Sequence, residues 1–330
     1  MQNKLILGLG VLILIGIGVW YSADKQSAST PSEITKVKIA NLPVIQGLPL
    51  YVAVDKGYFA EAGIEVEIVK FEAPNQIIDA IMTGQVDFTS PSGALGITGI
   101  ADFKNPGKLK VYAVAGGTKG NSGANLIIPN ESTLSTLADL KGKKLGILAG
   151  TIQWKTIARE ILEKNGLNMD SDLTIVELAP SVQVEALASG QVDALLALEP
   201  IPTIATNKST AKIWIADPTV LYISDPSWLG AGIVSVDFAE KNPDTTKKVI
   251  AVLERAMAEI KENPDAYRQH LKGHTSLTDE LITKVPIVDF KTCGQLTEQD
   301  KDSMQKFFDI FTKHKVVEGQ INVDGVLYCK

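Results

Sequence analysis

The chain has 330 residues, of which 45% are apolar and 21% are charged, so it can form two ordinary domains or one bilobal unit with substantial cores. Its 38 acidic and 32 basic residues give a net charge of −6, without the basic excess that a nucleic-acid backbone demands. Nucleic acid is therefore not an expected partner. Arginine is scarce, so few guanidinium groups are available to clamp a carboxylate or a phosphate.

The first 32 residues form a separate segment. An unbroken apolar run extends from Leu5 to Trp20 after Lys4, and a polar stretch follows from Ser22 to Ser32. A basic start before a long apolar run is typical of a secretory signal, and about 16 apolar residues is near the lower limit for crossing a bilayer. We expect residues 1–32 to be a signal peptide or membrane anchor with a linker. An uncleaved anchor is slightly favoured because no clear cleavage site follows.

From Thr35 onward, apolar strands alternate with helical stretches, which predicts a mainly parallel sheet with helices on both faces. The first series has expected strands at 37–40, 64–69, 86–89 and 109–115 and expected helices at 48–62, 75–83 and 94–101. A stretch rich in Gly, Ser and Asn at 116–123 then predicts a crossing to a second series.

The second series has expected strands at 125–128, 144–148, 173–177 and 194–198 and expected helices at 134–140, 152–165 and 181–188. The turn from Asp225 to Gly230 is the expected return crossing, before a strand at 232–236 and a helical remainder. We therefore expect an α/β fold with two lobes and two crossing strands. Residues 33–122 and 227–330 would form lobe 1, and residues 123–226 would form lobe 2.

The tetrapeptide Gly-Gln-Val-Asp occurs twice, at 84–87 and 190–193, each time between an expected helix and an expected strand. Ser90, Pro91 and Ser92 follow the first copy, and Glu199 with Pro200 follows the second. Carboxyl ends of parallel strands are where open α/β sheets bind ligands, so two similar lobes would enclose a cleft there. The alternative is an ordinary helix-to-strand turn in which Gly suits the helix C-cap.

Catalytic and metal-binding patterns are not found in the sequence. His270, His274 and His314 lack the spacing of a zinc site, and neither a phosphate-binding loop nor a nucleophile elbow is present. We therefore expect no metal, no cofactor and no catalytic residue. One junction is suggestive: Gly150 and Thr151 lie between a strand and a helix, where free N–H groups attract anions. Ordinary N-capping by Thr151 explains that junction equally well.

Cys293 and Cys329 are the two cysteines of the chain, and both are near its C-terminus. Outside the cytoplasm they can pair, and a disulfide would close a loop of about 35 residues and contribute about 3 to 4 kcal/mol in the chain-entropy model. Two buried thiols are the alternative.

Several stretches together resemble a known family. They are Leu48–Ala53, Lys56–Phe59, Ala62–Glu67, Ala80–Asp87, Asp139–Lys144 with Gly150 and Thr151, Gly190–Asp193 with Glu199 and Pro200, and Glu262–Pro264. In order and spacing they are similar to the periplasmic solute-binding proteins for nitrate, sulfonates, taurine and thiamine precursors, over nearly all of Val37 to Gly319. The resemblance implies a type II-like periplasmic binding protein fold. It also implies a monomer that captures a small molecule and delivers it to an ABC permease and its ATPase.

Carried onto this chain, the resemblance implies a ligand site between the lobes. Its expected members are Gln46, Ser90, Pro91, Ser92, Gly117, Thr118, Gly150, Thr151, Gln153, Glu199 and Trp228. Main-chain donors and hydroxyls would fix polar groups of the ligand, and Trp228 would stack on or cap its apolar part. Trp154 and Tyr51 are weaker candidates because core packing explains them better.

The ligand itself stays open between two interpretations. The Gly150 helix start suits a sulfonate or nitrate, although no Arg is evident nearby, whereas Glu199 suits an amine or an aminopyrimidine. One branch of the same fold is an enzyme that makes a thiamine pyrimidine, but its Cys-rich motif and cleft His have no counterpart here. A membrane-anchored sensory module is the other alternative.

Overall fold

The computed structural model describes residues 35–329, so the expected signal peptide or anchor at 1–32 lies outside the described residues. Within residues 35–329, no helix has both the length and the apolar character that crossing a membrane would need. The described part forms one compact unit.

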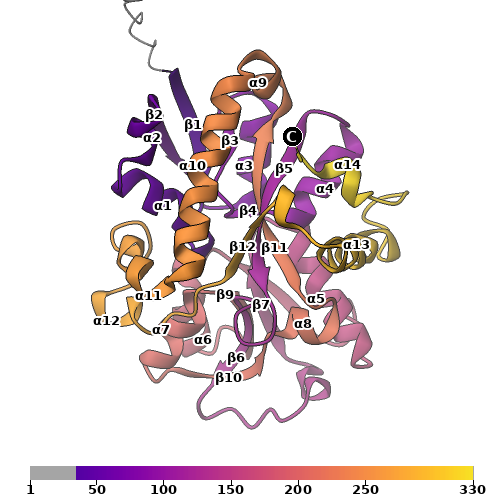
Figure 1. The fold of residues 1–330 in the computed structure, drawn as a ribbon. Helices are drawn as coiled ribbons and strands as arrows, with labels where there is room; N and C mark the ends of the chain where they lie inside the picture. The colour runs from indigo at the N-terminus through magenta and orange to yellow at the C-terminus, as the bar shows by residue number, and fades with distance from the viewer. Residues whose placement is uncertain (1–34, 330) are drawn as a thin grey trace, which may run out of the picture. The chain divides into compact units, whose positions relative to one another are not determined.

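Two β-sheets organise this unit (Figure 1). The first has the order β12-β5-β11-β3-β1-β2, with β4 paired to β11. Its strands are β1 (Thr35–Asn41), β2 (Ile64–Lys70), β3 (Phe88–Thr89), β4 (Gly93–Ala94), β5 (Leu109–Gly117), β11 (Ser227–Ser235) and β12 (Asp289–Thr292). Strand β1 pairs in parallel with β2 and β3, whereas β11 and β12 run antiparallel to β5.

The second sheet has the order β10-β6-β9-β7-β8. Its strands are β6 (Ala124–Pro129), β7 (Lys144–Leu148), β8 (Thr174–Leu178), β9 (Ala194–Leu198) and β10 (Ala211–Ala216). Strand β7 pairs in parallel with β8 and β9, and the β6–β9 and β6–β10 pairs are antiparallel. We call the first sheet with its helices lobe 1 and the second sheet with its helices lobe 2.

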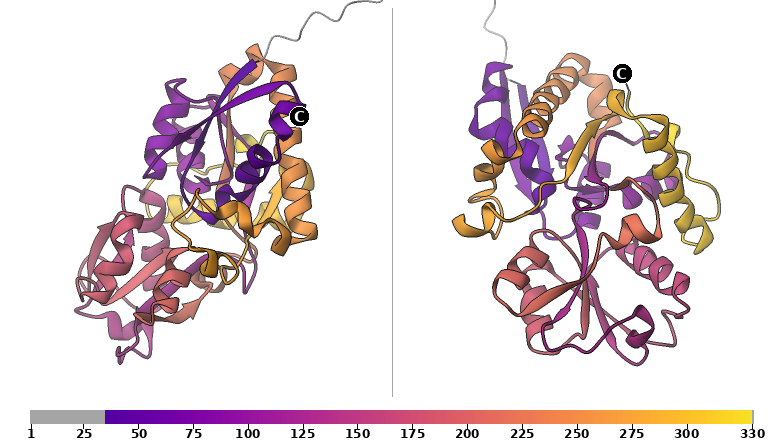
Figure 2. Two further views of the ribbon diagram at one scale, coloured as in Figure 1. Left: turned by 90° about the vertical axis from the view of Figure 1, so that its left-hand side faces the viewer. Right: turned by 60° about the horizontal axis from the view of Figure 1, so that its bottom comes forward.

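Helices pack around both sheets (Figure 2). Those of lobe 1 are η1 (Ile45–Gly47), α1 (Leu48–Asp55), α2 (Tyr58–Glu61), α3 (Pro74–Met82), α4 (Leu95–Lys104), α9 (Val236–Lys241), α10 (Pro243–Glu262), α11 (Pro264–Tyr267), η3 (Arg268–Leu271), α12 (Asp279–Ile282), η4 (Cys293–Gln295), α13 (Glu298–Lys313) and α14 (Val323–Val326). Those of lobe 2 are η2 (Leu137–Leu140), α5 (Ile152–Lys164), α6 (Pro180–Ala188), α7 (Ile201–Asn207) and α8 (Pro218–Tyr222).

The chain passes between the sheets twice, between β5 and β6 and again between β10 and β11. The expected boundaries at 122/123 and 226/227 fall in these two connections. The expected turn from Asp225 to Gly230 was wrong in extent, because β11 already begins at Ser227. Trp228 and Gly230 pair with β5, so the ladder between the two antiparallel strands incorporates residues that looked like a loop.

Glycines in the left-handed conformation end several helices. Gly84 and Gly190, the first residues of the two Gly-Gln-Val-Asp copies, have φ of 72° and 74° and follow α3 and α6. Gly57 has φ of 74° and corrects another expectation: the helix expected at 48–62 is two helices, α1 and α2. A left-handed residue cannot continue an α-helix, and Gly adopts that conformation without the cost of a Cβ clash.

The two Gly-Gln-Val-Asp copies make the same long-range contacts. In lobe 1, Asp87 N–H donates to the Lys38 carbonyl at 2.9 Å, and Lys38 N–H donates to Asp87 Oδ2 at 2.9 Å. In lobe 2, Asp193 and Lys144 make the same reciprocal pair, at 2.8 Å in both directions. Each aspartate thus joins the loop before one parallel strand to the neighbouring strand. The shared motif positions equivalent strands in both lobes.

Aromatic packing brings lobe 2 against lobe 1 through α5, α4 and α13. Phe308, Phe311 and Trp154 are buried in one cluster that spans these three helices. Gly96 in α4 permits the close approach, since a Cβ there would lie 2.4 Å from Cζ of Phe311. The aromatic residues of α13 therefore form core, as their helical spacing predicts.

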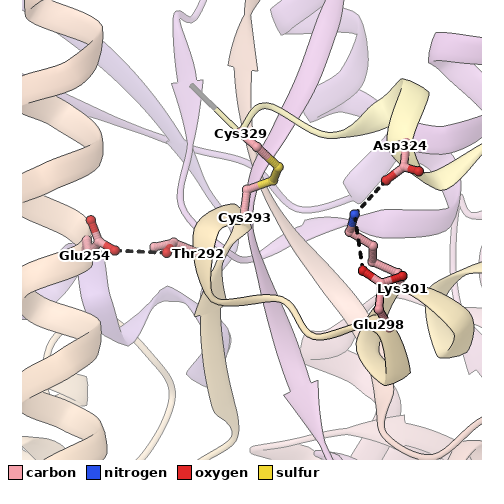
Figure 3. The surroundings of a disulfide bond; sticks show 7 residues. All are labelled: Glu254, Thr292, Cys293, Glu298, Lys301, Asp324 and Cys329. Carbon is pink, nitrogen blue, oxygen red and sulfur yellow. Dashed lines mark hydrogen bonds and ion pairs between the residues drawn. A yellow bond between two sulfur atoms is a disulfide. The ribbon is translucent and has the colours of Figure 1, made fainter.

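The C-terminal tail is fixed by a disulfide between Cys293 in η4 and Cys329 (Figure 3). The two Cα atoms are 5.2 Å apart, and 36 positions separate the cysteines in sequence. Lys301 of α13 also contacts the tail, with its ammonium group 2.9 Å from Asp324. The tail is thereby held against η4 and α13.

Candidate ligand-binding cavity

A cavity of about 150 Å³ lies between the two lobes. Lobe 1 contributes Leu42, Pro43, Val44, Gln46, Glu72, Pro74, Ser92, Gly93, Ala94, Leu229, Gly230 and Ser276 to its wall. Lobe 2 contributes Leu148, Gln153, Trp154, Pro180, Ser181, Gln183, Leu198, Pro200 and Ile201. The position follows from the topology, because Leu148 and Leu198 end the parallel strands β7 and β9. Ligand sites of open α/β sheets form at such carboxyl ends.

Helix N-termini surround the cavity, and for α3, α5 and α6 the reason is the same, since a helix that follows a parallel strand begins at the carboxyl edge. Pro74 is the first residue of α3, Ala94 is the N-cap of α4, Gln153 is in the first turn of α5 and Pro180 begins α6. The positive ends of these helix dipoles favour acceptor atoms of a bound molecule.

Gln46 carries a buried oxygen atom without a hydrogen-bond partner within the described residues. Its side chain lines the cavity and is 4% exposed, and its Oε1 atom has no hydrogen-bond partner within the described residues. A buried acceptor without a donor costs about 1 to 3 kcal/mol. A bound molecule that donates a hydrogen bond to this oxygen would remove that cost.

Gln153 is different, because its amide group is already used between the lobes. Its Oε1 accepts from Gly96 N–H at 2.7 Å, and its Nε2 donates to the Leu229 carbonyl at 3.3 Å. Both partners belong to lobe 1, whereas Gln153 belongs to α5 of lobe 2. Gln183 also lines the cavity, but its Nε2 donates to the Leu178 carbonyl at 3.1 Å within lobe 2.

Three of the expected site residues, Gln46, Ser92 and Gln153, line the cavity, and so does the weaker candidate Trp154. The rest of the Ser90–Ser92 turn lies behind the wall: the Ser90 hydroxyl donates to Asn41 Oδ1 at 2.6 Å and is fully buried. The Pro91 carbonyl lies 2.5 Å from where a Cβ of Gly230 would be. Ser90 and Pro91 therefore pack behind the wall of the cavity rather than lining it.

The helix start at Gly150 and Thr151 is occupied by the protein itself. Gly150 N–H donates to Glu177 Oε2 at 3.0 Å, and Thr151 Oγ1 accepts from Trp154 N–H at 3.0 Å as the N-cap of α5. Lys155 lies 2.7 Å from the Glu177 carboxylate and lowers the pKa of that group. Neither Gly150 nor Thr151 is part of the cavity wall.

Glu199 lies outside the cavity, although the next residue, Pro200, lines it. The Glu199 carboxyl group lines a separate depression of about 270 Å³ together with Asp217. It is 2% exposed, and burial raises its pKa to about 7, although Thr203 N–H donates to it at 3.2 Å. No cation of the described residues pairs with it.

The remaining expected residues lie near the crossings. Trp228 is buried, and its Nε1 donates to Asp300 Oδ1 at 3.2 Å, while the Lys291 ammonium lies 5.4 Å from its ring. Gly117 pairs with Ser227 at the end of β5, and Thr118 N–H donates to Asn121. None of Trp228, Gly117 and Thr118 lines the cavity.

The three histidines also lie away from the cavity. His270 is 2.7 Å from Asp55, His274 stacks on Tyr51 at 4.2 Å between ring centroids, and His314 is 2.8 Å from Glu160. Within residues 35–329, no group of three or more His, Cys, Asp or Glu side chains could hold a metal ion.

Sequence reasoning missed the apolar part of the wall. Leu148 and Leu198 were treated as strand ends, and Pro180 was left outside the helix expected at 181–188, so none of the three had a role in the expected site. Their position at carboxyl ends of parallel strands was a usable signal. Ser276, in a loop of the C-terminal part, carried no such signal.

Comparison with known proteins identifies the class to which this fold and cavity belong. The family model described as NMT1/THI5 like matches residues 45–267, which is more than half of the chain. The chain belongs to this family, and its expected resemblance to ABC solute-binding proteins is confirmed.

Individual relatives refine this picture. A candidate aliphatic sulfonates-binding protein of Bacillus subtilis is 25% identical over 331 residues, covering 96% of this chain and 94% of that protein. The alkanesulfonate-binding protein SsuA of Xanthomonas axonopodis pv. citri, solved with MOPS bound, has a TM-score of 0.73 and 19% identity, covering 90% of this chain and 99% of that one. The expected α/β periplasmic binding protein fold is confirmed, and the expected anchor helix lies outside the described residues.

Some relatives are enzymes. The 4-amino-5-hydroxymethyl-2-methylpyrimidine phosphate synthase THI13 of Saccharomyces cerevisiae is 24% identical over 254 residues, covering 73% of this chain and 72% of that protein. The family therefore includes both binding proteins and a synthase.

Proposed function

We propose that this protein is the extracytoplasmic solute-binding component of an ABC importer, which holds one small molecule between its lobes and delivers it to a permease. The observation that carries the proposal is the cavity whose wall comes from both lobes, with helix N-termini around it. A molecule bound there contacts both halves and can stabilise their closed arrangement.

Binding without conversion is supported by the wall itself. Within the described residues, no His, Cys, Lys or Arg lines the cavity, so the wall offers no cysteine or lysine nucleophile and no histidine acid or base. Location outside the cytoplasm is supported by the basic and apolar N-terminal sequence and by the Cys293–Cys329 disulfide. The names of the sulfonate-binding relatives agree with a transport role.

The test is to purify the chain from about Thr35 onward from its own host and examine it by native mass spectrometry. We expect one retained small molecule per chain, and small-angle scattering should show expansion when that molecule is removed. Protein that carries no small molecule and keeps the same envelope with every solute offered would contradict the proposal. A retained molecule that leaves the protein chemically changed would instead indicate the synthase branch.

A further inference from the structure

The charge of the ligand can be inferred from the cavity wall, given the proposed function of the cavity as the ligand site. Of the described residues that line it, Glu72 alone carries a formal charge, and Glu72 is exposed to solvent. An anion enclosed without a cation loses its hydration and gains no ion pair in return. Glu72 would in addition repel it.

The helix N-termini around the cavity attract acceptor atoms but carry no formal charge. At Gly150 and Thr151, the junction that the sequence predicted for an anion, donors are already in use. The N–H of Gly150, before α5, already donates to Glu177 Oε2 at 3.0 Å. Thr151 Oγ1 accepts from Trp154 N–H, so at least two of the N–H donors at this helix start, those of Gly150 and Trp154, are already engaged. An incoming sulfonate or nitrate would meet a carboxylate that already holds this position.

A cationic ligand lacks a partner as well. Glu199, the buried carboxyl group expected to receive an amine, lies in the separate depression with Asp217. Pro200 faces the cavity instead. An ammonium group in the cavity would therefore find no buried carboxylate in the described residues.

The wall does offer apolar surface and one unpaired acceptor. Twelve of the twenty-one lining residues are apolar, with Trp154 the largest of them. Gln46 is only 4% exposed, and its Oε1 atom has no hydrogen-bond donor within the described residues. An apolar cavity of about 150 Å³ is large enough for a benzene-sized molecule.

We propose that the cavity takes a compact, uncharged molecule with an apolar body about the size of a substituted six-membered ring, and with an N–H or O–H group that donates to Gln46 Oε1. The apolar body contacts Trp154 and the leucines at the ends of β7 and β9. The single donor orients the molecule against lobe 1, and the apolar contacts join it to lobe 2.

Pairs of probes with the same shape and different charge test this directly. Benzenesulfonamide with benzenesulfonate, and benzamide with benzoate, differ by one negative charge at pH 7. Titration calorimetry on the ligand-free protein should show the neutral member of each pair binding at least tenfold tighter. Tighter binding of either anion than of its neutral partner overturns the inference and leaves the proposed function intact.

The retained molecule gives an independent answer if the probes are too weak to measure. A neutral retained molecule with an N–H or O–H group supports the inference, and one with a sulfonate, carboxylate, phosphate or ammonium group overturns it. Protein that retains no molecule and binds none of the four probes contradicts the proposed function itself.

Gln46→Leu separates a ligand-binding role from a structural one. The substitution removes an unsatisfied acceptor, so the ligand-free protein should unfold at the same or a higher urea concentration. Affinity for the neutral probe or the retained molecule should fall at least tenfold. Unchanged affinity, or a fall in stability that accompanies the loss of binding, overturns the role of Gln46 as the acceptor.

Discussion

Gln153→Leu should open the protein in the absence of ligand. The substitution keeps an apolar group of similar size and removes both interlobe hydrogen bonds, to Gly96 N–H at 2.7 Å and to the Leu229 carbonyl at 3.3 Å. At about 0.5 to 1.5 kcal/mol for each bond, the closed arrangement loses about 2 kcal/mol relative to the open one. That energy changes the ratio of closed to open protein by about 30-fold.

Gln183→Leu is the matched control. Gln153 and Gln183 are both 2% exposed, both line the cavity and both belong to lobe 2, but the Gln183 amide bonds to Leu178 of its own lobe. Loss of one buried hydrogen bond should therefore lower the stability of the control by about 1 kcal/mol without changing the distance between the lobes.

The assay is the distance between spin labels at two exposed positions, Asp79 in α3 of lobe 1 and Glu185 in α6 of lobe 2. Ligand-free Gln153→Leu should show longer distances than the parent, and its ligand affinity should fall by a similar factor, because closure and binding are coupled. Equal distance distributions for Gln153→Leu, Gln183→Leu and the parent would refute the bridging role of Gln153.

Two further predictions concern stability. Burial raises the pKa of Glu199 from 4.5 to about 7, so the folded state holds this proton more tightly than the unfolded state. The shift contributes about 3 kcal/mol to the free energy of unfolding. This contribution is full below pH 4.5 and is lost as the pH rises through 7. Urea unfolding from pH 4 to 8 should show this loss in the parent and not in Glu199→Gln, while Glu185→Gln, whose side chain is 76% exposed, should behave like the parent; a parallel pH profile for Glu199→Gln and the parent would refute the assignment. Cys293→Ser with Cys329→Ser opens a loop of 36 positions and should cost about 4 kcal/mol, so that reductant shifts the urea midpoint of the parent and not of the double variant; an equal midpoint for the oxidised parent and the variant would contradict it.

Elements with strong local signals were predicted well. The strands expected at 144–148 and 194–198 match β7 and β9, because short apolar runs between turns that contain Gly or Pro leave little choice of boundary. The helix expected at 48–62 failed at Gly57, where a left-handed residue separates α1 from α2. The turn expected at 225–230 failed because strand pairing with β5 recruited residues whose composition favours a loop.

The site was harder to predict than the fold, because side-chain direction depends on tertiary contacts. Glu199 and Pro200 are adjacent in the sequence but line different sites. Pro200 lines the cavity, and Glu199 lines the separate depression. Trp228 is similar, since its indole is turned toward Asp300 while the next residue, Leu229, lines the cavity. Successive side chains of a strand point to opposite faces, and which face meets the cavity is decided by the packing of distant helices.

The sequence by itself determined the repeated framework. Gly-Gln-Val-Asp encodes a helix end through its glycine and a strand contact through its aspartate, and both depend on the local chemistry of those residues. Tertiary structure alone decided which groups are free to meet a ligand. The Glu177 carboxylate accepts the hydrogen bond of Gly150 N–H, and Gln153 forms hydrogen bonds between the lobes. Gln46, by contrast, has an oxygen atom without a partner in the described residues. Each outcome depends on partners far apart in the chain, so no local pattern could reveal it.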